Sequence, residues 1–346
     1  MADANESTLL EARGLGRTFG KGDGSVTALD DVTFSVAEGE TVVLVGESGS
    51  GKTTAARVVL GLETPDRGSV RISGRETSGL SERDWRQVRR NIQVVLQDPM
   101  SQLNRRHTVE KIVSSPLRAY RIGDKASQRL RVIELLEAVG LEADHLDRVP
   151  HEMSGGQCQR VAIARALAVK PKLVVLDESV SALDVSVRAQ VLNLLRDLQA
   201  RLNLSYLLIT HDLAVARYMG HRTYVMFNGR IVESGATEAV LADPQHPYTV
   251  SLLDSTPSGR LGMDQQHLGE APIRALPSPE PADQCRFLAR CDSSQSRELC
   301  RDNRPELRVV GLDHWTACHF PRGIDPSRQM YGRTNDDSVD PQEDMS

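Results

Sequence analysis

Short apolar runs separated by turn-forming residues predict a β-rich region at the start of the chain. The runs are Leu9–Gly14, Val26–Leu29, Val32–Val36 and Thr41–Val45, and they alternate with turn clusters such as GKGDG and AEGE. Short runs bounded in this way are typical of antiparallel strands. A further turn, strand and turn are expected between residues 61 and 75.

Three apolar runs further along the chain predict strands of a second sheet. They are NIQVVL at Asn91–Leu96, KLVVLDE at Lys172–Glu178 and LSYLLIT at Leu204–Thr210. Continuous apolar runs are expected where both faces of a parallel sheet are covered. Asn228 and Gly229 separate two more β-prone runs and predict a hairpin. The predicted fold class is therefore α/β, with a mixed or parallel central sheet.

Apolar residues at helical spacing predict two helices and their packed faces. Over residues 128–139 the core-facing side chains are expected to be Leu130, Ile133, Leu136 and Val139, and Gly140 should end the helix. Residues 185–202 form a second amphipathic pattern. Its apolar side consists of Val187, Val191, Leu194, Leu195, Leu198 and Leu202. The stretch from about 98 to 168 is predicted to be a helical subdomain.

The sequence GESGSGKTT lies between a predicted strand and a helical run, which is where a phosphate-binding loop belongs. Backbone N–H groups at a helix start, backed by the helix dipole, converge on an anion. Lys52 would reach the β- and γ-phosphates, and Thr53 would be one ligand of Mg²⁺. The alternative is a glycine-rich turn with an exposed lysine, but spacing and context both favour a nucleotide. The residues assigned to it are Gly46, Glu47, Ser48, Gly49, Ser50, Gly51, Lys52, Thr53 and Thr54.

Other candidate residues follow the remaining predicted strands. Asp177 and Glu178 end one apolar run, and His211 directly follows another. Because α/β sheets bind ligands at the carboxyl ends of their strands, these side chains are expected at the same edge as the phosphate loop. Ser154, in MSGGQCQR, is a predicted N-cap at a second helix start able to receive an anion. The Phe19 ring could either stack on an adenine or pack against the sheet.

Composition places the chain among ordinary globular proteins. It has 346 residues, 39% of them hydrophobic and 26% charged, and a net charge of −5. This charge gives no reason to expect nucleic acid as a partner. The first residues lack the features of a secretory signal, and no apolar run approaches the roughly 18 residues of a membrane helix. We therefore expect a cytosolic protein that only its partners hold at a membrane.

The composition changes after residues 1–253, which are expected to form one nucleotide-binding domain. Residues 254–282 are rich in proline, glycine and serine and are expected to be a linker. A region over 283–334 follows, and an acidic tail over 335–346 is expected to be disordered. Four of the five cysteines lie in that region, where a reducing cytosol favours metal or cluster ligation over disulfides. They are Cys285, Cys291, Cys300 and Cys318.

Six motifs in order strongly resemble those of ABC-transporter ATPase subunits. They are GESGSGKTT, VVLQDP, MSGGQCQR, LVVLDES, SALD and ITHD, within residues 46–212. HPYT at 246–249, followed by the four cysteines, is similar to the ATPases of oligopeptide and dipeptide importers. SGGQxQRxxIARAL and VSALDVS resemble the second of their two paired ATPases. The resemblance implies an ABC ATPase core with an antiparallel β subdomain, a helical signature subdomain and a small cysteine-containing extension.

The resemblance also implies individual roles. Glu178 would be the catalytic base, and His211 would contact the γ-phosphate. Thr53 and Asp177 would hold Mg²⁺, and Gln97 would sense Mg²⁺, the attacking water and the membrane subunit. Phe19 would stack on adenine. The signature residues Ser154, Gly155, Gly156 and Gln157 would complete the ATP site of a second ATPase subunit across a dimer.

Three positions depart from the family pattern. Ser179 stands where proline commonly follows the acid pair, and Cys158 stands where arginine is usual after SGGQ. Neither change removes a group with a direct chemical role, so activity is expected to survive. Arg105 replaces a proline that is usual in the LNP segment, which would affect the loop facing the membrane subunit.

The cysteine group leaves three possibilities open. Four thiolates can hold a [4Fe-4S] cluster, as the resemblance implies, or Zn²⁺, and the thiols could also be unligated. The cysteines are separated by five, eight and seventeen residues and lack the close CxxC pairs of zinc ribbons. This spacing favours the iron-sulfur cluster over zinc.

The expected function is ATP hydrolysis that powers uptake of oligopeptides or dipeptides at the cytoplasmic face of the cell membrane. The implied partners are a second ATPase subunit in a heterodimer, two membrane permease subunits and an extracytoplasmic solute-binding protein, but no nucleic acid. A nickel or other small-solute importer is the alternative within the subfamily. A non-transport ABC ATPase is less favoured, because such proteins usually carry two cassettes or a long coiled-coil insertion, and this sequence has neither.

Overall fold

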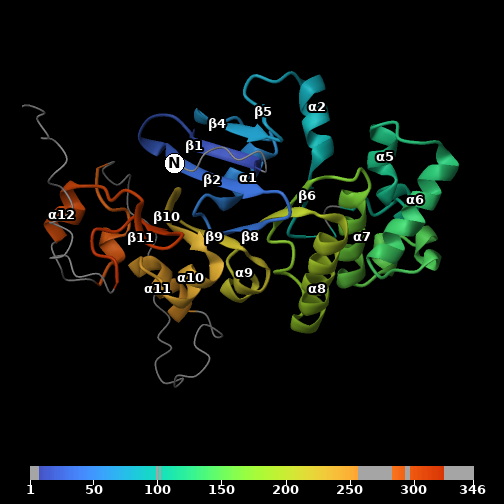
Figure 1. Ribbon diagram of the computed structural model, residues 1–346. Coiled ribbons are helices and arrows are strands. Elements are labelled where there is room, and N and C mark those ends of the chain that lie inside the picture. Colours follow the sequence, from blue (N-terminus) through green and yellow to red (C-terminus); the bar gives the residue numbers. More distant parts are fainter. Residues whose placement is uncertain (1–7, 99, 101–102, 256–282, 293–296, 323–346) are drawn as a thin grey trace, which may run out of the picture.

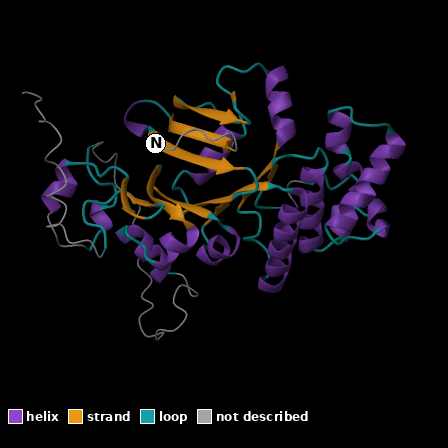
Figure 2. Cartoon of the chain, viewed as in Figure 1, coloured by secondary structure: helices purple, strands orange, loops and turns teal. Residues whose placement is uncertain are grey.

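Figure 1 presents the computed structural model of the protein, which describes residues 8–98, 100, 103–255, 283–292 and 297–322. Two sheets form its centre, with a group of helices at one end and further helices along the lower side of the sheets (Figure 2). Most of the expected linker and the whole acidic tail lie outside the described residues.

A four-stranded antiparallel sheet forms one layer, in the order β2-β1-β4-β5. Its strands are β1 (Thr8–Phe19), β2 (Val26–Ala37), β4 (Arg67–Ile72) and β5 (Arg75–Glu76). The prediction of separate strands at Val26–Leu29 and Val32–Val36 is wrong, because both belong to β2. The register against β1 shifts in this region, where Asp31 has a φ of 61°. Aspartate tolerates this left-handed conformation, so the strand continues through an irregularity that resembles a turn in the sequence.

The second sheet has eight strands in the order β11-β12-β10-β9-β3-β8-β7-β6. The pairs β3 with β8, β3 with β9, β7 with β8 and β6 with β7 are parallel. The strands are β3 (Thr41–Val45), β6 (Ile92–Val95), β7 (Leu173–Asp177), β8 (Ser205–Thr210), β9 (Arg222–Phe227), β10 (Arg230–Ala236), β11 (Arg308–Gly311) and β12 (His314–Thr316). The parallel strands place their carboxyl ends at one edge, as the apolar runs predict.

Successive residues of β3 face two different cores. Val43 and Val45 pack in the core that includes the helices, whereas Val42 and Leu44 pack in the core shared with the antiparallel sheet. All five residues of β3 are buried. This double burial explains why the strand reads as one unbroken apolar run, and it fixes the loop that follows Val45 on a rigid base.

Helices cover the central sheet and build a separate helical end, drawn in green in Figure 1. The helices are α1 (Lys52–Val59), α2 (Glu82–Asn91), α4 (Val109–Val113), α5 (Ser115–Ala119), α6 (Lys125–Ala138), α7 (Gly155–Leu167), α8 (Val185–Leu202), α9 (Leu213–Met219), α10 (Thr237–Ala242), α11 (Pro247–Asp254) and α12 (Arg297–Asp302). The pattern analysis did not predict α2, whose sequence ERDWRQVRRN has a single buried residue, Val88.

The prediction that Leu130 faces the core is wrong, because its side chain is 64% exposed. The buried residues near it are Val132, Leu135, Leu136 and Val139, which follow steps of three and four. A series with steps of three alone drifts around the helix by about 60° per step, so it leaves the buried face after two steps. Gly140 has a φ of 70° just after α6, as expected of a helix stop.

The cysteine-containing region joins the central sheet instead of standing apart from it. Strand β12 pairs antiparallel with β10, and β11 pairs with β12. Sequence patterns did not predict these two short strands. In Figure 1 this region, in orange and red, lies at the opposite end of the molecule from α5 and α6. The predicted hairpin is confirmed as β9 and β10, with Asn228 and Gly229 both at positive φ in its turn.

Candidate nucleotide site

The loop from Gly46 to Gly51 connects β3 to α1 and requires glycine at both ends. Gly51 has a φ of 104°, and a Cβ there would lie 2.3 Å from the carbonyl oxygen of Ala28. A Cβ on Gly46 would lie 2.2 Å from the carbonyl oxygen of Met226. Strand β2 and the β9–β10 hairpin therefore press on the loop from outside, and only glycine fits these two positions.

The start of α1 is available to an anion. Gly51 precedes the helix, and no side chain caps it. Within the described part of the chain, the N–H groups of Ser48, Gly49 and Gly51 donate to no acceptor. Such a loop at a helix N-terminus presents donors and a positive dipole end to phosphate.

Lys52 is buried and folded back over the loop. Its ammonium donates to the carbonyl oxygens of Gly46 and Glu47, each at 2.7 Å, and to Ser50 Oγ at 3.3 Å. Burial lowers the pKa of Lys52, while Glu178, Asp177 and Glu47 act in the opposite direction. The loop therefore holds a cation that incoming phosphates could draw outward.

Asp177 lies beside the phosphate loop, at the carboxyl end of β7. Its Oδ1 accepts a hydrogen bond from the Thr53 hydroxyl at 3.4 Å. Burial, together with the neighbouring Glu178 carboxylate, raises the pKa of Asp177, whereas Thr53 and Lys52 lower it. Paired carboxylate and hydroxyl oxygens are the ligand types that Mg²⁺ prefers.

Glu178 and His211 form the next pair along this edge. His211 Nδ1 lies 3.4 Å from Glu178 Oε1. Glu178 has a φ of 46°, and its N–H donates to the carbonyl oxygen of Ile209 at 2.9 Å. An ordinary side chain held at positive φ is a form of backbone strain that recurs at functional sites. Lys52, Thr53, Asp177, Glu178 and His211 thus meet at one sheet edge, as their positions after the strands predicted.

Two other predicted residues stand apart from this group. Gln97 is exposed beyond the end of β6, and within the described residues no hydrogen bond connects its side chain to the group. Phe19 ends β1 with its ring 38% exposed, and the Arg17 guanidinium lies 4.8 Å from the ring centroid. The exposed ring leaves room for a stacking base, but Phe19 also packs against Arg17.

The signature residues occupy the start of α7. The Ser154 hydroxyl accepts from the Gln157 N–H at 3.2 Å, and Gln157 Oε1 accepts from the Ser154 N–H at 2.9 Å. This reciprocal capping box confirms Ser154 as an N-cap. Gly155 and Gly156 form the first turn of the helix. In the described part of the chain, no hydrogen bond or ion pair joins these residues to Lys52 or to the acid pair.

The three departures from the family pattern are placed as follows. Ser179 is buried directly after the acid pair, and its hydroxyl has no partner among the described residues. Cys158 is fully buried in α7, and its thiol donates to the carbonyl oxygen of Pro150 at 3.4 Å. Arg105 is exposed. None of these side chains contacts the Lys52 group through a hydrogen bond in the described residues.

The four C-terminal cysteines line one small cavity together with His246 and His319. The cavity measures about 20 Å³. Burial raises the pKa of the Cys285 thiol to about 11 and that of Cys318 to about 12. The described residues contain no group of three or more His, Cys, Asp or Glu side chains already arranged to hold a metal ion. The four thiols are therefore neighbours around one cavity, but among the described residues they are not already arranged as a ligand set.

Sequence reasoning missed two residues that contact the phosphate loop. Arg290 forms an ion pair with Glu47, and the Tyr248 hydroxyl accepts a hydrogen bond from the Glu47 N–H. Tyr248 belongs to the HPYT motif, which was a signal of family membership but not of this contact. No sequence signal pointed to Arg290.

The fold and the site define a nucleotide-binding P-loop cassette. Residues 29–181 match the ABC transporter family, and residues 232–300 match the family described as "Oligopeptide/dipeptide transporter, C-terminal region". The chain is 40% identical over 329 residues to the oligopeptide transport ATP-binding protein AppF of Bacillus subtilis, covering 92% of this chain and 99% of AppF. It is 44% identical over 316 residues to a protein of Brucella ovis named "Putative peptide import ATP-binding protein", covering 90% of this chain and 98% of that protein. The chain therefore belongs to the ATP-binding subunits of ABC transporters.

Solved structures agree with this assignment. The ATP-binding cassette MJ0796, solved as a dimer bound to ADP and Pi, matches with a TM-score of 0.61 and 31% identity, covering 66% of this chain and 99% of MJ0796. CbiO1 from Clostridium perfringens, part of the transporter complex cbiONQ, matches with a TM-score of 0.61 and 28% identity, covering 68% of this chain and 91% of cbiO1. Among the described residues, no helix has the length and apolar character needed to cross a membrane.

Proposed function

We propose that this protein binds and hydrolyses ATP to drive import of oligopeptides or dipeptides through partner membrane subunits. The observation that carries the ATPase part is the meeting of Lys52, Thr53, Asp177, Glu178 and His211 at one sheet edge. The peptide part is supported by the match of residues 232–300 and by the similarity to AppF. We place it peripherally, at the cytoplasmic face of permease subunits, because it belongs to the ATP-binding subunits of transporters.

Each residue of the group has a role in this proposal. The loop amides and Lys52 bind the β- and γ-phosphates, and Phe19 stacks on the adenine. Thr53, Asp177 and Gln97 would hold Mg²⁺, which when bound neutralises charge on the phosphates. Glu178 takes a proton from the attacking water, and His211 holds the γ-phosphate while contacting Glu178.

The signature residues complete the site from a second subunit. Ser154 to Gln157 are exposed or half-exposed at a helix N-terminus, and among the described residues no hydrogen bond or ion pair joins them to this chain's own Lys52 group. A positive helix end suits the γ-phosphate bound by a partner. We propose a dimer of ATPase subunits that closes on ATP, reopens after hydrolysis and drives two permeases supplied by a solute-binding protein. The second subunit is a paired but different ATPase.

Purification of the assembled transporter from membranes tests the transport proposal. We expect two permeases to accompany the chain, and we expect dipeptides or oligopeptides to raise ATP turnover in proteoliposomes loaded with the binding protein. Stimulation by Ni²⁺ alone would assign the transporter to a small solute instead. Association with nucleic acid, without permeases, would overturn the transport proposal altogether.

We further propose that Cys285, Cys291, Cys300 and Cys318 hold a [4Fe-4S] cluster, with Zn²⁺ as the alternative. Four thiols around one cavity supply the donor set for either group. A cavity of about 20 Å³ has room for about one water molecule, so the thiols must turn outward to admit a cluster. Anaerobic purification with metal analysis and absorption spectroscopy distinguishes the two. A brown protein with about four irons supports the cluster, and a colourless protein with one zinc contradicts it.

A further inference from the structure

The phosphate loop is held at Glu47 by two residues from the C-terminal part of the chain. The Arg290 guanidinium donates two hydrogen bonds to the Glu47 carboxylate, each of 2.8 Å. The Tyr248 hydroxyl accepts from the Glu47 N–H at 2.8 Å. The Glu47 carbonyl oxygen in turn accepts from the Lys52 ammonium at 2.7 Å. Glu47 therefore links Arg290 and Tyr248 directly to the lysine of the loop.

Contacts other than the one with Glu47 also restrict Arg290. It ends a short 3-10 turn, Leu288–Arg290, in which its N–H donates to the Phe287 carbonyl oxygen at 3.0 Å. Its guanidinium lies 5.5 Å from the ring centroid of Phe227 and 5.6 Å from that of Phe287. These cation–π contacts restrict the side chain, which lowers the entropy lost in forming the two-bond pair.

Tyr248 reaches the loop from a buried aromatic cluster. Its side chain is fully buried, with its ring centroid 4.6 Å from that of Phe227 and 5.7 Å from that of Phe287. Burial raises the pKa of Tyr248, so its hydroxyl keeps its proton at neutral pH. Because the ring cannot move without disturbing the core, the hydroxyl is a fixed acceptor for the Glu47 N–H.

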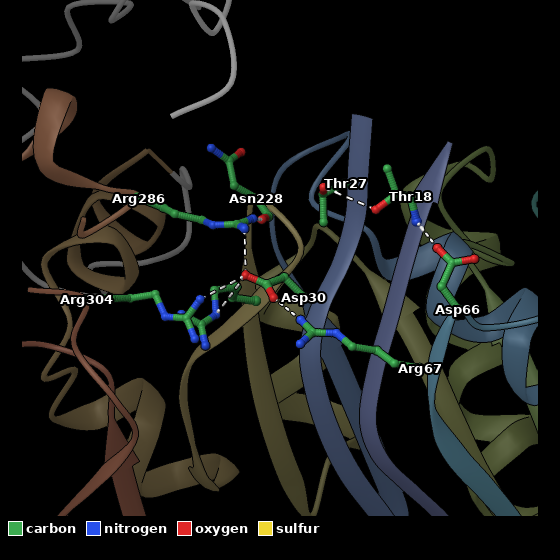
Figure 3. Close-up of polar contacts among 9 residues, drawn as sticks. Thr18, Thr27, Asp30, Asp66, Arg67, Asn228, Arg286 and Arg304 are labelled. Atoms are coloured by element: carbon green, nitrogen blue, oxygen red, sulfur yellow. Dashed lines mark hydrogen bonds and ion pairs between the residues drawn. The ribbon is translucent and has the colours of Figure 1, made fainter. Parts of the chain in front are cut away.

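The same C-terminal segment supports the loop by a second route (Figure 3). Arg286 donates to the carbonyl oxygen of Asn228 and, at 2.7 Å, to the Asp30 carboxylate, which also pairs with Arg67 and Arg304. The next residue of that hairpin turn, Gly229, donates its N–H to the Ser50 carbonyl oxygen at 2.9 Å. The segment 285–291 thus contacts both the phosphate loop and the Asn228–Gly229 turn, which is itself hydrogen-bonded to the loop.

Arg290 also compensates the negative charge of Glu47 beside the phosphate loop. Its hydrogen bonds lower the pKa of Glu47, which is therefore ionised at neutral pH. A carboxylate beside a phosphate-binding loop repels the nucleotide unless a cation compensates it. Removing Arg290 would both release the loop at Glu47 and leave that negative charge unpaired.

We propose that Arg290 and Tyr248 are positioning residues for nucleotide binding, which act through Glu47 to hold the phosphate loop and its lysine in the form that receives ATP. The C-terminal region that carries the cysteines thereby sets ATP affinity. This inference rests on the proposed role of the phosphate loop, so its test includes Lys52→Ala.

Binding of Mg-ATP to the full chain, measured by titration with a fluorescent ATP analogue, tests the proposal. We expect Arg290→Gln to raise the dissociation constant about threefold to tenfold, since the pair is two-bonded but roughly half exposed. Tyr248→Phe keeps the ring but removes the hydroxyl, and it should raise the dissociation constant about threefold. In the assembled transporter, kcat at saturating ATP should stay within about twofold while KM rises, because the reacting groups are untouched.

A double-mutant cycle separates positioning from general loosening. In a Glu47→Gln background, Arg290→Gln should change the dissociation constant by less than about twofold. Arg75→Gln, which breaks an ion pair of the same 2.8 Å length and similar exposure with Asp84, should leave it unchanged. An equal effect of Arg290→Gln in both backgrounds, or none in the native one, overturns the proposal. If Lys52→Ala also leaves ATP binding intact, the role of the loop itself fails.

Discussion

Two helix N-termini in this protein carry glycine-rich sequences suited to phosphate, yet they are built in opposite ways. Helix α1 follows Gly51 in a left-handed conformation, and no side chain caps it. Helix α7 follows Ser154, whose hydroxyl and N–H both take part in a capping box with Gln157. At the first helix start the Lys52 side chain is buried and folded back over the loop, whereas at the second the residues Ser154 to Gln157 are exposed or half-exposed.

The two helix N-termini also differ in how many ionisable side chains of the same chain lie near them. Around α1 the fold gathers a lysine, two carboxylates and a histidine, which are the groups of this chain to which we assign phosphoryl transfer. At the α7 start a capping box satisfies the Ser154 and Gln157 N–H groups. Among the described residues no ionisable group pairs with this start except His145, which lies 3.3 Å from the Gln157 amide. Such a terminus is stable alone and is suited to meet a ligand that another molecule holds.

The largest expected effect comes from removing the carboxylate at the α1 site. Glu178→Gln should lower ATP turnover in the assembled transporter about 10² to 10⁴-fold, because the amide cannot take the proton of the attacking water. ATP binding to the full chain should remain within about threefold of the parent, since Lys52 and the loop amides are unchanged. Turnover assays and ATP titration measure the two quantities. Parental turnover would refute Glu178 as the base.

A charge placed at the α7 start tests whether it serves a partner. In this chain a Cβ on Gly155 would meet nothing within 4 Å, so Gly155→Asp should fold normally, and a carboxylate in a first helical turn is favourable. Against a partner's phosphate the same carboxylate is repulsive, so turnover of the assembled complex should fall about tenfold or more.

Gly155→Asn, which has the same shape without the charge, is the matched control and should lose much less turnover. ATP affinity of the single chain should be parental for both variants. Weakened ATP binding by the single Gly155→Asp chain would place the signature in this chain's own site, and the contrast between the two helix starts would then be lost.

The smallest expected effect is the loss of stability when the N-cap of α7 is removed. Ser154→Ala removes the cap of α7 and should lower the free energy of unfolding by about 1 kcal/mol in urea titrations. Ser81→Ala, which removes the N-cap of α2, a helix with no assigned nucleotide residue, should cost a similar amount. Only Ser154→Ala should also reduce turnover. No loss of stability for Ser154→Ala would mean that the capping box is not formed in solution.

Much of the site was predictable because its residues are tied to strand ends. Asp177, Glu178 and His211 each follow an apolar run, and parallel strands bring such positions to one edge regardless of their separation in sequence. The pairing of β7 with β8 sets Asp177 opposite Ile209, two residues before His211. Periodicity did not predict the buried face of α6 correctly, because more than one series of apolar residues at helical spacing can be drawn through this sequence, and Leu130 belongs to the wrong one.

Contacts with no periodic or motif signal could not be predicted. Arg290 and Glu47 are 243 positions apart, and nothing local to either residue marks the other. Strand β12 is three residues long and is held by pairing with β10 on one side and β11 on the other. Nothing in the sequence distinguishes Asp30 from the other acidic residues. In the structure it forms ion pairs with Arg67, Arg286 and Arg304.

The sequence by itself determined the phosphate loop, the apolar strands of the parallel sheet and the position of each reactive residue after its strand, because these depend on local spacing and on glycine's backbone freedom. Only the tertiary structure decided that the cysteine-bearing region joins the central sheet and contacts Glu47 through Arg290. Those contacts depend on chain segments packed together by burial of apolar surface, a long-range and non-directional effect that leaves no pattern at either end of the contact.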